Sequence, residues 1–170
     1  VPLHGLLYSK DGSLSYFIKR FDRYSKGKKY AMEDFAQLTG NSRDTKYDYT
    51  MEKLVKVIDE YCTFPAIEKA DFFKRVLFCF ITGNEDMHLK NFSVITKAGK
   101  TTLTPVYDFL NSSISIKNPQ EELALSLKGK KSNFKSTELI EYYAKERLGL
   151  NDKTIDTILS DMNKSLSKWI

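Results

Sequence analysis

The chain has 170 residues, of which 41% are hydrophobic and 13% aromatic, and this composition is sufficient for one globular domain with a buried core. Its 27 basic and 22 acidic residues give a net charge of +5, and its two cysteines, Cys62 and Cys79, lack the spacing of a zinc site or a disulfide framework. No apolar run is long enough to span a membrane and the first residues do not resemble a signal peptide, so we expect a cytoplasmic protein with reduced cysteines and no membrane partner.

The N-terminal part of the sequence predicts a β-hairpin followed by helices. Two apolar, partly alternating runs, residues 3–8 and 14–19, are separated by the turn signal Ser9-Lys10-Asp11-Gly12-Ser13. After a lysine-rich loop, we expect a short helix from Met32 to Leu38, and Thr50 is suited to cap a second helix. That second helix has apolar residues at helical spacing, namely Leu54, Val57, Ile58 and Tyr61.

The segment from Pro65 to about Thr82 predicts the central helix of the core. Proline is favoured in the first turn of a helix, and the second half of this segment should be buried on nearly all sides. Its apolar residues form one stripe and also extend onto other faces: Phe73, Val76, Leu77, Phe80 and Ile81, then Phe72, Phe78 and Cys79.

A second hairpin is expected from residues 92–96 and 101–104, with Lys97-Ala98-Gly99-Lys100 at its turn. Two further helices should follow, one over residues 136–148 and one that carries Ile155, Ile158, Leu159, Met162 and Leu166. The fold class is therefore mostly α (α+β), in which small hairpins accompany a helical body.

Two polar segments flank the second hairpin and carry a constellation typical of phosphoryl transfer. The first is Gly83-Asn84-Glu85-Asp86-Met87-His88-Leu89-Lys90-Asn91, and the second is Tyr107-Asp108-Phe109. In protein kinases a catalytic Asp precedes an Asn by five positions, and this Asn and a later Asp hold Mg²⁺. Because the hairpin joins the two segments, it can hold Asn91 and Asp108 side by side.

These residue types suit Mg²⁺ with a nucleotide, because this hard cation takes few protein oxygens and shares the others with phosphates. Asn91 and Asp108 would be the metal ligands, and Asp86 would deprotonate the attacking hydroxyl. Lys90 would lie near the transferred phosphoryl group and offset its charge. For His88, in the same loop, a role in stabilising the loop is favoured over a direct catalytic role. The alternative is that the loop is a polar turn after the helix, and that Asp108 is a capping residue.

The same segments closely resemble the HipA family of serine/threonine kinase toxins. The resemblance includes Gly83 to Ser93 and Leu103 to Phe109, and it extends upstream to Lys19-Arg20-Phe21-Asp22-Arg23, which is similar to the hinge of that family. Residues 32–38 and 46–48 are similar to the next segments of that family. All these segments occur in the same order as in the family, over roughly residues 1–150.

The resemblance implies a kinase-like C-terminal lobe, comprising a hairpin and hinge over residues 1–23 and a helical lobe over 24–170. It implies ATP and Mg²⁺ as cofactors, with the adenine at the hinge, mainly against backbone groups of Lys19, Arg20 and Phe21. It also implies a protein substrate, in this family an aminoacyl-tRNA synthetase, and a HipB-like DNA-binding antitoxin as partner.

Two parts that a complete kinase requires are missing from this sequence. No Gly-x-Gly precedes the catalytic loop, and the phosphate-binding Lys of the family is expected before Val1. Lys19 is an alternative for that Lys, but it is disfavoured because it continues directly into the hinge. We therefore expect an N-terminal lobe that is truncated or separately encoded, without which this chain is inactive.

Two other interpretations compete with a kinase lobe. The first is a catalytically inactive HipA-like binding module. The second is a nucleic-acid binder that uses lysines 26–29 and 128–131; it is disfavoured because aromatic residues are not interleaved with them, so we expect these clusters to be solvated turns. Ser112, Ser113 and Ser115 follow Asp108 where a kinase activation segment would run, and an ordinary polar loop is favoured there.

Overall fold

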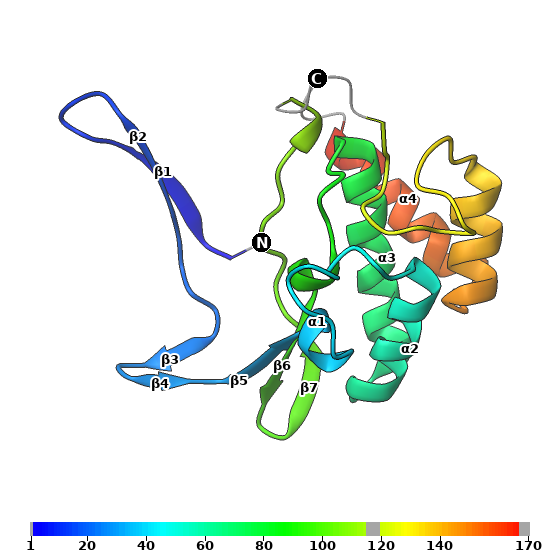
Figure 1. Cartoon of the computed structure of the whole chain (residues 1–170), viewed down its shortest axis with the longest axis horizontal. Helices are drawn as coiled ribbons and strands as arrows, with labels where there is room; N and C mark the ends of the chain where they lie inside the picture. Colours follow the sequence, from blue (N-terminus) through cyan, green and yellow to red (C-terminus); the bar gives the residue numbers. More distant parts are fainter. Residues whose placement is uncertain (1, 115–119, 167–170) are drawn as a thin grey trace.

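The computed structural model describes residues 2–114 and 120–166 and has an α+β architecture (Figure 1). The β1–β2 hairpin extends away from a helical body in which α2, α3 and α4 lie together. In chain order the elements are β1 His4–Tyr8, β2 Leu14–Ile18, β3 Arg23–Ser25, β4 Lys28–Lys29, β5 Ala31–Asp34, α1 Phe35–Leu38, α2 Met51–Tyr61, α3 Pro65–Thr82, η1 Leu89–Asn91, β6 Ser93–Lys97, β7 Lys100–Leu103, η2 Ser112–Ile114, η3 Glu138–Arg147 and α4 Asp152–Leu166.

The N-terminal hairpin is confirmed, and its apolar side chains are exposed. The strands β1 and β2 are antiparallel, and Leu6 pairs with Tyr16 and Tyr8 with Leu14. Alternate residues of a strand share a face, so five large side chains form one surface, which we call the apolar hairpin face. Its members and their exposed fractions are Leu6 60%, Tyr8 81%, Leu14 53%, Tyr16 58% and Ile18 38%.

The expected helix from Met32 to Leu38 is only partly correct. Its first half is the strand β5, in which Met32 pairs with Ile95 of β6. Only Phe35–Leu38 is helical, and Asp34 begins this turn because its Oδ1 accepts a hydrogen bond from the Gln37 backbone N–H at 2.8 Å. Pairing with β6 satisfies the backbone of residues 31–34, and so a distant strand overrides the local helical preference. The lysine-rich loop before it also contains a hairpin, β3–β4, that the sequence analysis did not predict.

The helix α3 has the expected bounds and is central to the core. Phe72, Phe73, Val76, Leu77 and Cys79 are buried, and α3 packs against α2, β7 and α4. The prediction that its second half is buried on nearly all sides is wrong at the end of the helix. Ile81 is 41% exposed there.

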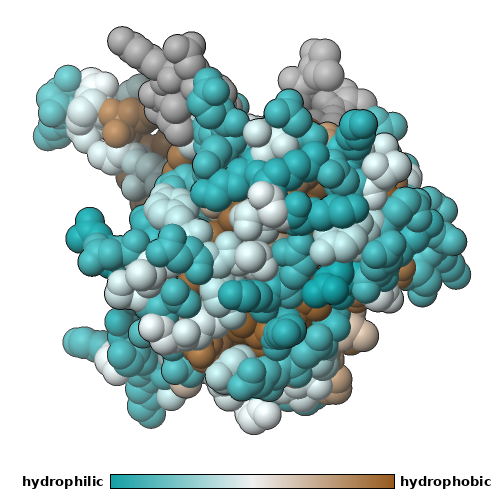
Figure 2. Space-filling model, turned by 45° about the vertical axis from the view of Figure 1, so that its right-hand side comes forward, coloured by the Kyte–Doolittle hydropathy of each residue, from teal (hydrophilic) through white to brown (hydrophobic). Residues whose placement is uncertain are grey.

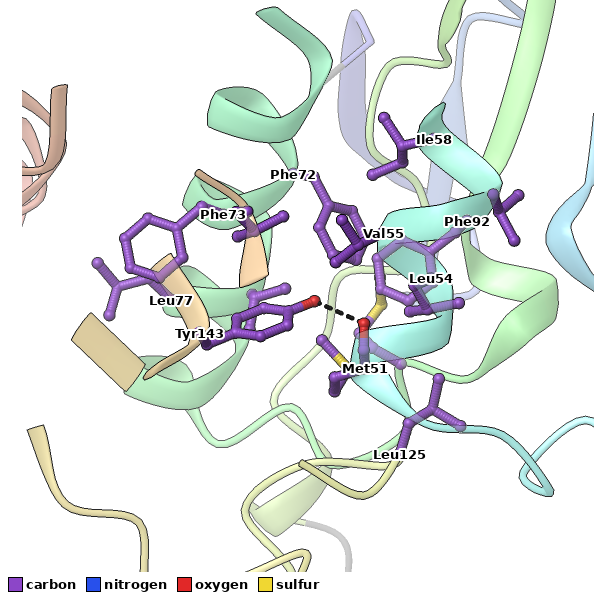
Figure 3. Close-up of a cluster of buried hydrophobic side chains, with 14 of the residues drawn as sticks. Met51, Leu54, Val55, Ile58, Phe72, Phe73, Leu77, Phe92, Leu125 and Tyr143 are labelled. Atoms are coloured by element: carbon purple, nitrogen blue, oxygen red, sulfur yellow. Dashed lines mark hydrogen bonds between the residues drawn. The ribbon is translucent and has the colours of Figure 1, made fainter. Parts of the chain in front are cut away.

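Figure 3 shows how α2, α3 and η3 meet around Tyr143. This side chain is fully buried, and its hydroxyl donates to the backbone O of Met51 at 3.0 Å. Cys62 and Cys79 are free and buried, and burial raises the pKa of each thiol to about 12. The expectation that both cysteines are core residues is therefore confirmed, and both thiols stay protonated at neutral pH.

The turn of the β6–β7 hairpin carries backbone strain at a residue other than glycine. Lys97 pairs with Lys100, and the two residues between them, Ala98 and Gly99, have φ of 49° and 72°. Asn-Gly is preferred in such a two-residue turn. We expect Ala98→Asn to raise the free energy of unfolding by about 0.5–1 kcal/mol, and Ala98→Val to lower it by about 1–2 kcal/mol, in urea denaturation. Equal free energies of unfolding for the two variants would show that the backbone is not strained at Ala98.

Candidate functional site

The loop after α3 places Asp86 and Asn91 beside each other. Gly83 ends the helix in the left-handed conformation with φ of 67°, and Asn84 is buried and accepts from the Asp86 backbone N–H at 3.2 Å. The backbone O of Asp86 then accepts from His88 N at 2.9 Å and from Asn91 Nδ2 at 3.0 Å. These bonds fold the loop back on itself through η1.

The hydrogen bond from Asn91 also orients its amide. Because Nδ2 is fixed on the backbone O of Asp86, Oδ1 is the end of the buried amide that remains for a ligand. An amide oxygen and a carboxylate are ligands that Mg²⁺ accepts together with phosphates and water. Among the described residues no group of three or more His, Cys, Asp or Glu is placed to hold a metal.

The β6–β7 hairpin brings Asp108 to the same region. The Tyr107 hydroxyl donates to the backbone O of Lys90 at 2.8 Å and contacts the Ser93 hydroxyl, which joins the two ends of the hairpin. Asp108 is exposed and has φ of 56°, a conformation that Asp tolerates better than most residues but that still costs free energy. Strained residues of this kind are concentrated at functional sites.

His88 is buried in the loop and feels the charges of both Asp86 and Asp108. Burial lowers its pKa below the usual range, as does the positive charge of Lys46, whereas Asp86 and Asp108 act in the opposite direction. Both carboxylates are therefore within electrostatic range of one imidazole. A lowered pKa makes His88 neutral at pH 7, and this fits the expected bracing role better than proton transfer. Its Nδ1 is buried and has no hydrogen-bond partner in the described part of the chain.

Lys90 makes an ion pair that the sequence did not reveal. Its Nζ donates to Asp34 Oδ2 at 2.9 Å, and Asp34 also caps α1. Asp34 lines a pocket of about 380 Å³, together with Ser93 and Tyr107. The ammonium of Lys90 is thus paired with a residue that lines the pocket, although its side chain remains 41% exposed.

The hinge segment lines a second pocket of about 250 Å³. Its walls include Lys19, Arg20 and Phe21 from the hinge, and Met32 and Tyr107 from the sheet side. The rings of Phe21 and Tyr107 lie 6.0 Å apart between centroids with 30° between their planes. The two pockets share Asp22, Met32 and Tyr107 in their walls, so they adjoin at Tyr107, the residue before Asp108.

The polar groups of Lys19 and Arg20 are partly engaged. Lys19 N donates to the backbone O of Leu3 at 2.7 Å, and the Arg20 guanidinium pairs with both oxygens of Asp22, at 2.9 and 2.6 Å. In this arrangement Arg20 faces Asp22, and the apolar surfaces of the hinge remain for a flat ligand.

The segment after Asp108 is hydrogen-bonded to the loop from Gly83 to Asn91. Ser112 is buried, and its Oγ accepts from Glu85 N at 2.8 Å and donates to the Gly83 backbone O at 3.2 Å. Glu85 Oε2 in turn accepts from Glu121 N at 3.2 Å. Ser112 is therefore a structural residue, in line with the favoured loop interpretation. Ser115 lies outside the described residues, as does the side chain of Ser113.

Sequence reasoning missed one contact at the centre of the site. The Tyr47 hydroxyl donates to Asp86 Oδ1, from a segment that lies between α1 and α2. Tyr47 lies in the segment 46–48 that resembles the family, but no local signal in the sequence indicates its partner.

The lysine clusters at residues 26–29 and 128–131 were expected to be solvated turns. The first cluster is exposed, and Lys130 and Lys131 of the second pair with Glu138 and Glu121.

Within the described part of the chain no helix is long and apolar enough to cross a membrane. The face turned to the viewer in Figure 2 is mainly hydrophilic, and hydrophobic colour shows between the polar side chains.

Comparison with known proteins agrees with this picture. The family model described as HipA-like C-terminal domain matches residues 1–170. The chain is 34% identical over 161 residues to a Sinorhizobium fredii protein named "Putative kinase Y4dM". This alignment covers 89% of this chain and 37% of that protein. It is 32% identical over 129 residues to a Haemophilus influenzae protein named "Putative kinase", in an alignment that covers 66% of this chain and 36% of that protein. The chain thus spans little more than a third of these relatives.

A solved structure supports the fold. A chain of the Shewanella oneidensis toxin–antitoxin complex of HipA, HipB and operator DNA superposes with a TM-score of 0.74 and 22% sequence identity. The match covers 93% of this chain and 42% of the other. At this identity the likeness establishes the α+β fold of the described residues.

Proposed function

The chain belongs to the HipA-like C-terminal domain family, and from this membership and the geometry of the site we propose that it is the acceptor- and metal-binding lobe of a protein serine/threonine kinase of the toxin type. In this proposal it works with an N-terminal lobe, is neutralised by a HipB-like DNA-binding antitoxin, and modifies a protein hydroxyl. The substrate class implied by the family resemblance is an aminoacyl-tRNA synthetase.

One observation carries the proposal. The hinge residues 19–21 and Tyr107 line one pocket, although they are far apart in the sequence, and Asp108 follows Tyr107 directly. This pocket adjoins the one that Asp34 lines beside Lys90. In the proposal a flat base lies at the hinge and its phosphates point toward Asp108, which follows the pocket residue Tyr107, and toward the loop from Gly83 to Asn91, as phosphoryl transfer requires.

Each site residue has a defined task in the proposal. Asp86 accepts the proton of the attacking hydroxyl, while its backbone O holds the Asn91 amide in place. Asn91 Oδ1 and the Asp108 carboxylate hold Mg²⁺. Lys90 contributes positive charge beside the pocket, and neutral His88 packs under the loop. Bound Mg²⁺–ATP supplies the phosphoryl group and offsets its charge.

The apolar hairpin face supports the need for an N-terminal lobe. Large apolar side chains are exposed on this face, and Leu7 and Phe17 are exposed on the opposite one. Exposed apolar surface of this extent is typical of a site covered by another protein part. The relatives are more than twice as long as the matched region, so they contain enough chain for such a lobe. In the proposal this lobe supplies the phosphate-binding loop and Lys that the sequence lacks.

The metal part of the proposal can be tested at Asp108. Asn tolerates the left-handed conformation, so Asp108→Asn should keep the fold while it removes a charged metal ligand. We expect the affinity of the assembled protein for ATP to fall about tenfold or more with Mg²⁺ present and to change little without Mg²⁺, as measured by calorimetric titration. Asp44→Asn, at an exposed carboxylate outside the site, is the matched control. Equal Mg²⁺ dependence in Asp108→Asn and the wild type would contradict the assignment.

The second candidate is a catalytically inactive binding module. It predicts that the chain joined with its N-terminal lobe binds nucleotide but transfers no phosphate, whereas the kinase proposal predicts both.

A further inference from the structure

Tyr47 occupies the side of Asp86 from which an acceptor would approach. Its hydroxyl donates to Asp86 Oδ1, the type of bond that an attacking hydroxyl makes with its base. The backbone of Asp86 is already engaged inside the loop by Asn84, His88 and Asn91. The bond from Tyr47 is therefore made to the carboxylate, which is the chemically active part of the residue.

The neighbours of Tyr47 fix the direction of its hydroxyl. Leu89 N donates to the backbone O of Lys46 at 3.2 Å, which joins the Tyr47 segment directly to the catalytic loop. The ring lies edge-on to His88 at 5.0 Å and 80°, and the Nζ atoms of Lys46 and Lys131 are 4.9 and 5.9 Å from its centroid. These contacts hold the phenol in place.

The phenol is nevertheless at the surface. Tyr47 is 37% exposed, and the charges packed against it come from three elements: Lys46 beside it, Asp86 in the catalytic loop, and Lys131 with its partner Glu121. A side chain so exposed can leave its position without unfolding the core. Tyr47 therefore combines a bond to Asp86 with an exposed side chain.

We propose that Tyr47 is a positioning residue that holds the place of the acceptor hydroxyl on Asp86 until the protein substrate displaces it. This inference rests on the proposed kinase function. The donor on Asp86 Oδ1 is Tyr47 in the free site and the substrate hydroxyl in the working complex. The substrate and Tyr47 compete for one acceptor atom.

The arrangement also restrains a side reaction. If water occupied the acceptor position, its oxygen would bond to the γ-phosphorus of ATP, the bond from that phosphorus to the β–γ bridging oxygen would break, and ADP would leave. The proton of the water would pass to Asp86. While the Tyr47 hydroxyl is bonded to Oδ1, water cannot take this position. The contacts of the Tyr47 ring with His88 and Lys46 hold the phenol oxygen away from the γ-phosphorus.

The contact itself is testable in the chain as it stands, by ¹³Cζ-tyrosine NMR titration. Burial, the hydrogen bond to Asp86 and the charge of Asp86 raise the pKa of Tyr47 to about 12. We expect Asp86→Ala to lower this pKa in part, because the hydrogen bond and the charge of Asp86 are lost while burial, the largest cause, and the smaller effect of Glu121 remain. Asp48→Ala removes a carboxylate next to Tyr47 in the sequence and should leave the pKa unchanged. An unchanged pKa in Asp86→Ala would overturn the inference.

The competition is testable in the assembled kinase with its protein substrate. Tyr47→Phe should lower the KM for the acceptor about tenfold, because the substrate no longer displaces a hydrogen bond to a charged group, and kcat should change much less. ATP hydrolysis without acceptor should rise. Tyr49→Phe, at a neighbouring tyrosine, is the control and should alter neither quantity.

The outcomes distinguish the role of Tyr47 from the proposed kinase function. An unchanged KM and unchanged hydrolysis in an active Tyr47→Phe kinase contradict the role of Tyr47 alone. An assembled wild-type protein that transfers no phosphate contradicts the proposed function, and with it the acceptor role, whatever the pKa of Tyr47.

Discussion

Replacement of Asp86 by Asn in the assembled kinase is expected to reduce phosphoryl transfer about 10²–10⁴-fold, the usual contribution of a general base. The carboxylate is partly exposed at the edge of the loop, where a hydroxyl can reach it. The backbone bonds of Asp86 to Asn84, His88 and Asn91 do not depend on its side chain, so the variant should retain the loop. The affinity for ATP should therefore change little, and the loss should appear in kcat.

A radiolabelled phosphate-transfer assay measures this loss, and nucleotide titration measures the affinity. Asp48→Asn is a matched control, because Asp48 is exposed and lies beside Tyr47 in the sequence. If Asp86→Asn transferred phosphate at the wild-type rate, Asp86 would not be the base. If ATP affinity fell as much as the rate, the residue would act in nucleotide binding instead.

A charge on the apolar hairpin face is expected to prevent assembly with the N-terminal lobe. Leu6 is 60% exposed and pairs with Tyr16, so Leu6→Glu would place an unpaired carboxylate in the middle of the proposed interface. We expect affinity for a separately supplied N-terminal lobe to fall at least tenfold, and phosphate transfer at limiting lobe concentration to fall with it.

The matched control is Ser15→Glu, which introduces the same charge on the opposite face of the hairpin, where Ser15 pairs with Leu7. Neither change should alter the free energy of unfolding of the chain by more than about 0.5 kcal/mol, because both residues are exposed. Calorimetric titration of the lobe and urea unfolding of each variant give the two measurements. Equal affinity of both variants for the lobe would show that this face is not the interface.

The parts of the fold that were predictable from sequence depend on local chemistry. Thr50 caps α2 through its Oγ1, Pro65 begins α3, and Gly83 ends it in the left-handed conformation. Each signal acts within one turn of helix, so the sequence window contains the whole cause. The β6–β7 hairpin was predictable for the same reason, since its turn contains Gly99.

The features that were missed depend on contacts between distant residues. The strand β5 forms because residues 31–34 pair with β6, and no local pattern indicates that partner. The bonds of Asp86 with Tyr47 and of Lys90 with Asp34 likewise join separate segments. The loop from Gly83 to Asn91 was recognisable because it is continuous, whereas its supports become visible only in three dimensions.

The central claim is that Asp86, Asn91 and Asp108 form the catalytic half of a phosphoryl-transfer site. The most direct measurement is transfer of the labelled γ-phosphoryl group of ATP to protein by the chain joined with its N-terminal lobe, with Mg²⁺ and with the metal chelated. We predict labelled protein only when Mg²⁺ is present, and only background labelling in Asp86→Asn and Asp108→Asn. Labelling that persists without Mg²⁺, or that is equal in the two variants and the wild type, would contradict the claim.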